Sequence, residues 1–259
     1  MTTQVHPTAV IDPSAVLGEG VEIGPYCIVG PGVTLGDRCR LYSHVVIAGP
    51  TIIGVENEFY PFSCIGQQTQ DLKYTVEPTR LEIGAGNTFR EFTTVHRATD
   101  PQGVTKVGNG GNFLSYSHIA HDCIVGDEVV FSNNGTLAGH VEVGDRVVVG
   151  GLTAIHQFCR IGRLAISGGC SKIVQDVPPF MMVDGNPAHV RHINQIGMER
   201  AGFSKETIRA IKDAFRILYR NELNTAQALV KLGEEFGRSH PEIGQLIDFV
   251  RESKRGIIR

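Results

Sequence analysis

Three histidines near the middle of the chain, His121, His140 and His156, have a spacing that would place them along one edge of a coil of eighteen residues. His121 lies eighteen residues before Gly139, and Gly139 lies eighteen residues before Gln157. His140 and His156 are directly next to these two positions in the sequence, so the three histidines would form one column along the coils. An imidazole can take a proton from a hydroxyl group, because its ordinary pKa lies near neutral pH. Neighbouring imidazoles can also bind a metal ion. The column therefore predicts a functional site of one of these two kinds.

Asp122 and Gly139 suit the first kind of chemistry. The Asp122 carboxylate could orient the ring of His121, and the Gly139 N–H could stabilise an oxyanion. The metal alternative stays open at this point. Hexapeptide carbonic anhydrases bind zinc through histidines that four residues separate, whereas two residues separate His118 from His121 here.

The column depends on a repeat of six residues. From Val5 to Ile65, over Ile83, Phe89 and Val95, and from Val107 to Ile173, the first position of 25 of 26 hexads is Val, Ile, Leu or Phe, and Ser167 is the exception. Six residues fit one short strand and one turn. Three such hexads form one triangular coil of a parallel β-helix, with the apolar first residues inside and the coils about 4.8 Å apart.

The repeat is interrupted twice, at about residues 67–82 and 97–106. Asp71, Glu77 and Pro101 stand there at positions that should carry an inward apolar side chain. Because an unpaired charge in a dry core is costly, both segments are predicted to leave the coil as loops. Loops that leave a rigid scaffold often carry function.

The repeat ends before residue 190. We expect a β-helix over residues 1–189 and an α-helical domain over residues 190–259. Ser204 is predicted to cap one helix, a second begins at Thr225, and Pro241 stands near the start of a third. One role of these helices would be to cover the open strand edges of the last coil.

Composition and charge exclude several classes of protein. The formal net charge is −3, and 41% of the residues are hydrophobic. No apolar run of about 18 residues predicts a transmembrane segment, and the first residues do not resemble a secretory signal, so we expect a soluble cytoplasmic protein. The acidic charge lies in residues 1–189 and the basic charge in residues 190–259, which argues against nucleic acid and allows an acidic protein partner at the basic end.

The six cysteines form no CxxC pair. Four of them, Cys27, Cys39, Cys123 and Cys159, fall at the fifth position of the hexad. They are predicted to be small buried side chains, with no disulfide or zinc site.

Several motifs together resemble the UDP-N-acetylglucosamine O-acyltransferase family of hexapeptide-repeat acyltransferases. They are QDLKY from Gln70, EPTR from Glu77, His96–Arg97, HIAHDC from His118, LAGH from Leu137, AIHQF from Ala154, GGCS from Gly168, QDVPP from Gln175, GFS from Gly202 and RGIIR at the end of the chain. The resemblance covers nearly the whole chain. It implies a left-handed β-helix, a homotrimer, and no metal ion or other cofactor.

The resemblance also implies a reaction, the first step of lipid A biosynthesis. His121 would be the general base that deprotonates the 3-hydroxyl of UDP-N-acetylglucosamine. That oxygen would attack the thioester of an (R)-3-hydroxyacyl chain on acyl carrier protein directly, without a covalent acyl-enzyme. Asp122 would orient His121, and the Gly139 amide would face the oxyanion.

The remaining site residues follow from the same resemblance, in three groups of substrate contacts. Sugar and nucleotide contacts would be Gln70, Asp71 and Lys73; supporting polar contacts would be His118, His140, His156 and Gln157; contacts to the UDP end would be His96, Asn194 and Arg200. The chain departs from the family at Ala201, where an arginine is frequent, and at Ala98, where glycine is common. Gly169 would leave the acyl groove open, which predicts a longer acyl chain.

Three alternatives remain beside this interpretation. A hexapeptide carbonic anhydrase would bind zinc stoichiometrically. A non-catalytic β-helix, such as an ice-binding protein, would show flat rows of threonine and would not need His121. The related enzyme that acylates the glucosamine amine carries an extra N-terminal domain, which the hexads beginning at Val5 disfavour.

Overall fold

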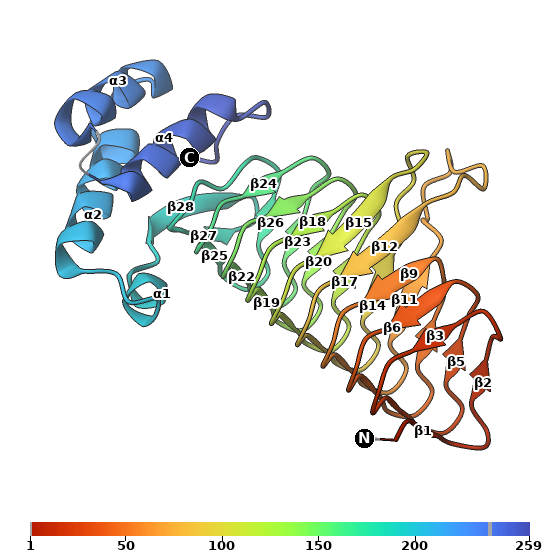
Figure 1. Cartoon of the computed structure of the whole chain (residues 1–259). Coiled ribbons are helices and arrows are strands. Elements are labelled where there is room, and N and C mark those ends of the chain that lie inside the picture. The colour runs from red at the N-terminus through yellow and green to blue at the C-terminus, as the bar shows by residue number, and fades with distance from the viewer. Residues whose placement is uncertain (1, 238–239) are drawn as a thin grey trace.

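The computed structural model describes residues 2–237 and 240–259, and in this part of the chain the strands form three sheets that wrap into one long shaft (Figure 1). The sheet that extends furthest along the shaft contains β1 (Gln4–Val5), β4 (Glu22–Ile23), β7 (Arg40–Leu41), β10 (Glu58–Phe59), β13 (Thr88–Phe89), β16 (Asn112–Phe113), β19 (Val130–Phe131), β22 (Val148–Val149), β25 (Ile166–Ser167), β27 (Met181–Gly185) and β28 (Ala188–Ile193). The second contains β2 (Val10–Ile11), β5 (Ile28–Val29), β8 (Val46–Ile47), β11 (Cys64–Gln67), β14 (Thr94–His96), β17 (His118–Ile119), β20 (Thr136–Leu137), β23 (Ala154–Ile155) and β26 (Lys172–Ile173). The third contains β3 (Val16–Leu17), β6 (Val33–Leu35), β9 (Thr51–Ile53), β12 (Arg80–Ile83), β15 (Val104–Val107), β18 (Ile124–Val125), β21 (Glu142–Val143) and β24 (Arg160–Ile161).

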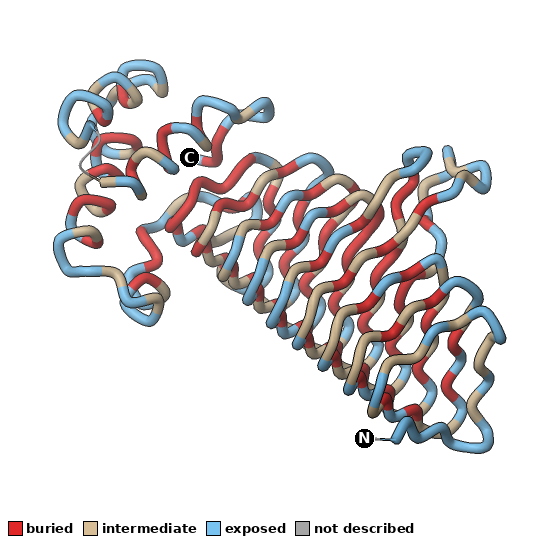
Figure 2. Tube along the Cα trace, viewed as in Figure 1, coloured by how far each residue is buried: buried red, intermediate tan, exposed pale blue. Residues whose placement is uncertain are grey.

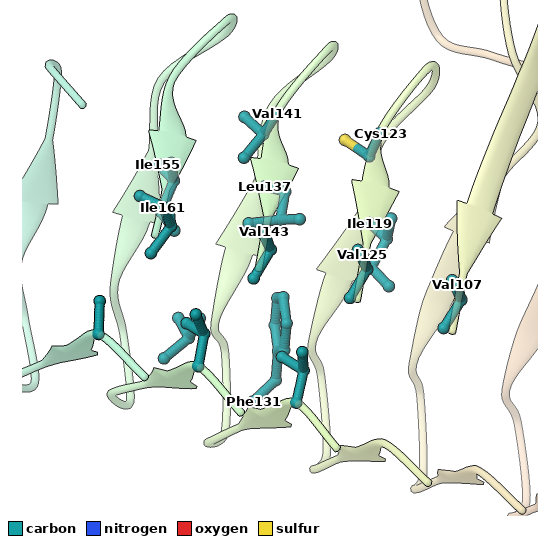
Figure 3. Close-up of a cluster of buried hydrophobic side chains, with 14 of the residues drawn as sticks. Val107, Ile119, Cys123, Val125, Phe131, Leu137, Val141, Val143, Ile155 and Ile161 are labelled. Atoms are coloured by element: carbon teal, nitrogen blue, oxygen red, sulfur yellow. The ribbon is translucent and has the colours of Figure 1, made fainter. Parts of the chain in front are cut away.

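Up to β27, successive strands of each sheet are parallel and one coil apart, which confirms the predicted parallel β-helix. Ile119 pairs with Leu137, and Leu137 pairs with Ile155, so that side chains eighteen residues apart lie in neighbouring coils. Figure 3 shows these three side chains projecting between the faces of the shaft.

The first position of the hexad fills the interior of the shaft. Phe59, Phe89, Phe113 and Phe131 are fully buried and form a column, with 4.8 to 5.3 Å between the centroids of neighbouring rings. From Val21 onward the buried residues lie on the inside of the coils, whereas exposed residues lie at the turns and at outward-facing strand positions (Figure 2). Residues 2–20 include no buried residue. Ser167, the exception in the pattern, is buried and its hydroxyl oxygen accepts a hydrogen bond from the Gly150 N–H.

The cysteines have the predicted role. All six are free, and those at the fifth position of the hexad are buried. Burial raises the pKa of the Cys123 thiol to about 12 and that of the Cys159 thiol to about 11. These thiols are packing groups at neutral pH.

Both interruptions of the repeat leave the shaft at the same corner, where Figure 1 shows them in orange and yellow. The first loop comprises residues 68–79, between β11 and β12, and the second comprises residues 97–103, between β14 and β15. Both are shorter than the expected ranges, because Arg80–Ile83 and Val104–Val107 pair with each other as strands. Their inward residues Leu81 and Thr105 are fully buried, so the coil resumes earlier than the charged residues suggested.

The chain leaves the shaft through an antiparallel hairpin of β27 and β28, whose turn contains Asn186 and Pro187. The expected boundary at residue 189 therefore falls inside β28. The helices follow it: α1 (Gln195–Arg200), α2 (Lys205–Arg220), α3 (Thr225–Phe236) and α4 (Pro241–Glu252). The Ser204 hydroxyl caps α2 as predicted, and Pro241 is the first residue of α4. The short helix α1 was not predicted.

The last residues return to the shaft. Asp176 and Ile257 form a parallel bridge, and the Ile258 N–H donates to the Asp176 carbonyl at 2.9 Å. Ile257 and Ile258 are buried. The end of the chain thus covers part of the strand edge that the last coil would otherwise expose.

Candidate active site

One corner of the shaft brings the predicted histidine column together. The His140 N–H donates to the His121 carbonyl at 3.0 Å, and the Phe158 N–H donates to the Gly139 carbonyl at 3.2 Å, so these residues lie in three consecutive coils. Asp122, His140 and Phe158 occupy equivalent turn positions with φ of 58°, 59° and 64°. This left-handed conformation is uncommon for residues other than glycine. It recurs at the turns along the shaft and gives the side chains of this corner a common direction.

His121 and Asp122 form a buried pair. His121 Nδ1 lies 2.8 Å from Asp122 Oδ2, and the two side chains are 8% and 9% exposed. With Nδ1 bonded to the carboxylate, the Nε2 atom of the ring is left for a substrate. Such an arrangement fixes the direction of an imidazole that takes up a proton.

Gly139 lies against the ring of His121. A Cβ atom at this position would overlap the Cε1 and Nε2 atoms of the imidazole, so that only glycine fits there without displacing the ring. Among the residues that the structure describes, the Gly139 N–H donates no hydrogen bond. The amide is therefore free to stabilise a negatively charged oxygen beside the ring.

The second loop surrounds the Asp122 carboxylate. The Thr99 N–H donates to Asp122 Oδ2 at 2.9 Å, and the Asp122 N–H donates to the Thr105 hydroxyl at 2.9 Å. A Cβ at Gly103 would stand 3.0 Å from Asp122 Oδ1. Sequence reasoning missed Thr99 and Gly103, because a loop without periodicity gives no signal of what it contacts, and it missed Thr105 on β15, which it assigned to the loop.

His140 completes the corner. Its ring stacks on Phe158, with centroids 4.6 Å apart, and meets the His121 ring edge-on at 5.1 Å. One ligand atom each from His121, Asp122 and His140 lies within 4.8 Å of the others, a separation that would suit a metal ion. However, Asp122 Oδ2 already accepts hydrogen bonds from Thr99 and His121, and a metal ion on that oxygen would have to replace them.

His96 and His118 lie beside this corner on β14 and β17. Burial, reinforced by the neighbouring imidazoles of His96 and His121, lowers the pKa of His118 to about 4, and burial lowers the pKa of His96. Both rings are therefore neutral at pH 7. His118 Nδ1 is 2.7 Å from the Thr94 hydroxyl, whereas the buried His96 Nδ1 has no partner among the described residues. A buried polar atom of this kind favours a ligand or water that binds it.

Comparison with known proteins decides the family of the chain. The family model described as UDP-N-acetylglucosamine O-acyltransferase, domain 2, matches residues 176–258, and that of the bacterial transferase hexapeptide (six repeats) matches residues 2–37. The acyl-[acyl-carrier-protein]–UDP-N-acetylglucosamine O-acyltransferase of Verminephrobacter eiseniae is 46% identical over 262 residues, which cover 99% of this chain and 100% of the relative. The chain belongs to the UDP-N-acetylglucosamine O-acyltransferase family. The predicted membership, and with it the predicted acyltransferase class, is confirmed.

Solved structures of this family have the same fold over the whole chain. The LpxA structure of Acinetobacter baumannii superposes with a TM-score of 0.95 at 48% identity and covers 98% of this chain and 99% of its own. The UDP-N-acetylglucosamine O-acyltransferase of Moraxella catarrhalis superposes with a TM-score of 0.94 at 45% identity, with the same coverage. None of the helices in the described part of the chain combines the length and the apolar composition needed to cross a bilayer.

Three predicted contacts of this acyltransferase lie on the first loop. The side chains of Gln70 and Lys73 are exposed, and that of Asp71 is partly buried. The loop is held by its own hydrogen bonds: Asp71 Oδ1 accepts from the Lys73 N–H at 2.9 Å, and the Asp71 N–H donates to the Thr69 hydroxyl at 3.0 Å. Gln70 and Lys73 therefore stand exposed on a loop whose Thr69 bonds to Thr99, the residue that donates to Asp122.

Other predicted contacts do not meet His121 within one chain. Gly169 lies on a different corner of the shaft, where Cys170 bonds to the Gly151 carbonyl one coil away. The buried Asn194 side chain donates to the Leu164 carbonyl at 2.8 Å and accepts from the Gly197 N–H at the start of α1. The structure therefore gives Asn194 a capping role that the sequence did not suggest, while Arg200 is exposed at the end of α1.

A groove of about 770 Å³ adjoins the histidine corner. Its lining includes Asp122, His140 and Phe158 from the shaft and Arg255 from the last segment of the chain. The predicted contacts His156 and Gln157 are exposed, and the Arg255 guanidinium lies 3.4 Å from His156 Nδ1. Arg255 begins the RGIIR motif, but its place in this groove could not be predicted, because only the return of the C-terminal end to the shaft brings it there.

Proposed function

We propose that this acyltransferase moves an (R)-3-hydroxyacyl chain from acyl carrier protein to the 3-hydroxyl of UDP-N-acetylglucosamine, the first step of lipid A biosynthesis. In this proposal the enzyme acts in the cytoplasm. The relatives named above supply the donor and acceptor classes. The observation that carries the mechanism is the buried His121–Asp122 pair beside the free Gly139 amide.

The reaction uses these three groups in order. His121 Nε2 takes the proton of the sugar hydroxyl while its oxygen attacks the thioester carbonyl carbon. The C–O bond forms, and the carbonyl oxygen gains a negative charge that the Gly139 N–H stabilises. The C–S bond then breaks, and the imidazolium returns its proton to the departing thiolate of the carrier. Asp122 keeps the ring directed at the hydroxyl throughout and stabilises the charge on it.

A covalent acyl-enzyme is not part of this proposal. The cysteine nearest to the pair is Cys123, whose buried thiol donates to the Ala138 carbonyl and has a pKa raised to about 12. A thiol of that kind is a poor nucleophile at neutral pH. Direct attack by the sugar oxygen needs only groups that the corner already presents.

We further propose that the enzyme works as a homotrimer with its sites between subunits. Five rings stack along the corner that carries Gly169: Tyr26, His44, Phe62, Phe92 and Tyr116. The rings of Phe62 and Tyr116 are 50% and 55% exposed, and a contiguous apolar patch of this kind usually marks an interface. Packing this ladder near a neighbour's histidine corner would bring Gly169 and Arg200 to a site that one chain leaves incomplete.

Incubation with UDP-N-acetylglucosamine and a panel of 3-hydroxyacyl carrier proteins tests the proposed activity. Mass spectrometry of the nucleotide should show addition of one 3-hydroxyacyl group, with the longer chains preferred because Gly169 leaves the groove open. Product lost on removal of the 3-hydroxyl from the acceptor would identify the position. The absence of any acylated nucleotide with every donor would reject the proposal, and stoichiometric zinc with carbon dioxide hydration would favour the carbonic anhydrase alternative.

A further inference from the structure

The two loops that leave the shaft are joined by a chain of buried hydrogen bonds that ends on Asp122. On the first loop, Thr69 accepts the Asp71 N–H at 3.0 Å. On the second loop, the Thr99 hydroxyl donates to the Thr69 hydroxyl at 2.7 Å. The Thr99 N–H then donates to Asp122 Oδ2, the oxygen that also holds His121 Nδ1.

The two hydroxyl groups that make this connection are shielded from water. Thr69 is 5% exposed and Thr99 is 8% exposed, so that water cannot readily replace either hydroxyl. The loops also touch through the backbone, where the Arg97 N–H donates to the Gln67 carbonyl at 2.9 Å. That contact joins the bases of the loops, whereas the Thr69–Thr99 contact joins the segment that carries Asp71 to the segment that holds Asp122.

We propose that Thr69 and Thr99 are positioning residues that tie the first loop to the Asp122 carboxylate and so hold the His121–Asp122 pair in its reactive orientation. This inference rests on the proposed function and deepens it, since it makes the orientation of the base depend on a loop expected to contact the sugar nucleotide. Loss of the connection lets the second loop shift and lets Asp122 turn away from His121. A misplacement of a catalytic group by about 1 Å can lower a rate by about a hundredfold.

The chain offers a matched control for this inference. Thr79 lies on the same first loop, is 3% exposed and, within residues 2–237 and 240–259, has no hydrogen-bond partner for its hydroxyl oxygen. Thr79→Val and Thr69→Val therefore make the same change of shape at two buried sites of one loop. Only Thr69→Val removes one of the hydrogen bonds that connect the first loop to Asp122.

The test is steady-state transfer by the full-length protein from a 3-hydroxyacyl carrier protein to UDP-N-acetylglucosamine. Thr69→Val and Thr99→Val should each lower kcat by about ten- to a hundredfold, whereas Thr79→Val should stay within about twofold of wild type and Thr69→Ser should restore most of the rate. In an Asp122→Asn background, Thr69→Val should change kcat by less than about twofold, because the orientation that it maintains is already lost.

Each outcome decides between a positioning role and a purely structural one. Equal kcat for Thr69→Val and Thr79→Val, or the same fold loss with and without the Asp122 carboxylate, overturns the inference. If Thr69→Val fails to fold, Thr99→Val in the two backgrounds decides in its place. An inactive wild-type enzyme would instead refute the proposed function, and full activity of His121→Ala would refute the base assignment, so these failures are distinguishable from that of the inference.

Discussion

At the scale of single residues, the neighbourhood of each imidazole in the site differs although the residue type is the same. His121 bonds to a carboxylate, His118 to the hydroxyl of Thr94, and His96 Nδ1 to no partner in the described chain. These neighbours decide which ring can gain a positive charge during the reaction. A carboxylate stabilises the charge, and a buried site with other imidazoles opposes it.

The lowered pKa of His118 predicts a stability that depends on pH. The folded protein disfavours protonation of this ring, whose pKa falls from the ordinary value of 6.5 to about 4. The native state therefore has its full stability above about pH 6.5 and loses up to about 3 kcal/mol as the pH falls through 4. Urea unfolding of wild type and His118→Gln at a fixed protein concentration measures this loss. The variant should lose less stability between pH 7 and pH 4, and an identical loss in both proteins would contradict the explanation.

At the scale of elements, a buried carboxylate adds to the backbone bonds that hold the C-terminal end on the shaft. Asp176 is 1% exposed; its Oδ1 accepts the Arg160 N–H at 2.8 Å and its Oδ2 accepts the Ser253 hydroxyl at 2.7 Å. Both bonds connect the last coil to neighbouring chain segments. The segment that they hold also contains Arg255, which lines the groove.

Replacing this carboxylate should release the C-terminal segment. Asp176→Ala leaves buried donors without an acceptor, and we expect the free energy of unfolding to fall by about 2 to 4 kcal/mol. Asp248→Ala is the control, because Asp248 pairs with Arg251 on the exposed face of α4 and should contribute about 0.5 kcal/mol or less. Thermal unfolding and limited proteolysis of the last residues measure the difference. Equal stability of the two variants would show that Asp176 does not hold the segment.

The basic residues of α2 are expected to bind the acyl carrier protein, since the sequence allows an acidic partner at this basic end of the chain. Arg209, Lys212 and Arg216 line a groove along α2, and Arg216 is partly neutralised by Asp213. Replacing Arg209 and Lys212 together by glutamine should raise KM for the acyl carrier protein several-fold and reduce its dependence on salt. KM for UDP-N-acetylglucosamine should not change. Unchanged kinetics with the carrier protein at low salt would dismiss this role of α2.

Elements whose apolar residues recur at a regular spacing could be predicted from the sequence, whereas irregular or very short segments could not. The spacing of apolar residues predicts the register of the coils, because one side chain of each hexad must enter the shaft, and this placed Gly139 beside His121. The loop contacts of Thr69, Thr99 and Gly103 escaped prediction, because they depend on how two irregular segments meet. Helix α1 escaped as well, since Gln195–Arg200 is too short for helical periodicity to be visible.

At the scale of the whole molecule, the shaft carries its aromatic ladder on one corner and its histidine column on another. A monomer would leave the ladder in water, which gives a physical reason for association. Predicted contacts such as Gly169 and Arg200 would then be explained by neighbouring subunits.

A charge within the ladder should separate the subunits. Phe62 stacks between His44 and Phe92 and is half exposed, so Phe62→Asp is tolerated by one chain but not by an apolar interface. We expect analytical ultracentrifugation to show a folded monomer with little or no acyl transfer. Glu56→Gln, an exposed change on another corner, should leave the oligomeric state of the wild-type protein unchanged. A fully active monomeric variant would contradict the proposal that sites lie between subunits.

The most direct test of the central claim is the turnover of His121→Ala with UDP-N-acetylglucosamine and a 3-hydroxyacyl carrier protein, measured beside wild type by mass spectrometry of the product. If His121 takes the proton of the sugar hydroxyl, kcat should fall by about 10² to 10⁴ while the fold and the oligomeric state are unchanged. A folded variant that transfers the acyl chain within a few-fold of the wild-type rate would contradict the account.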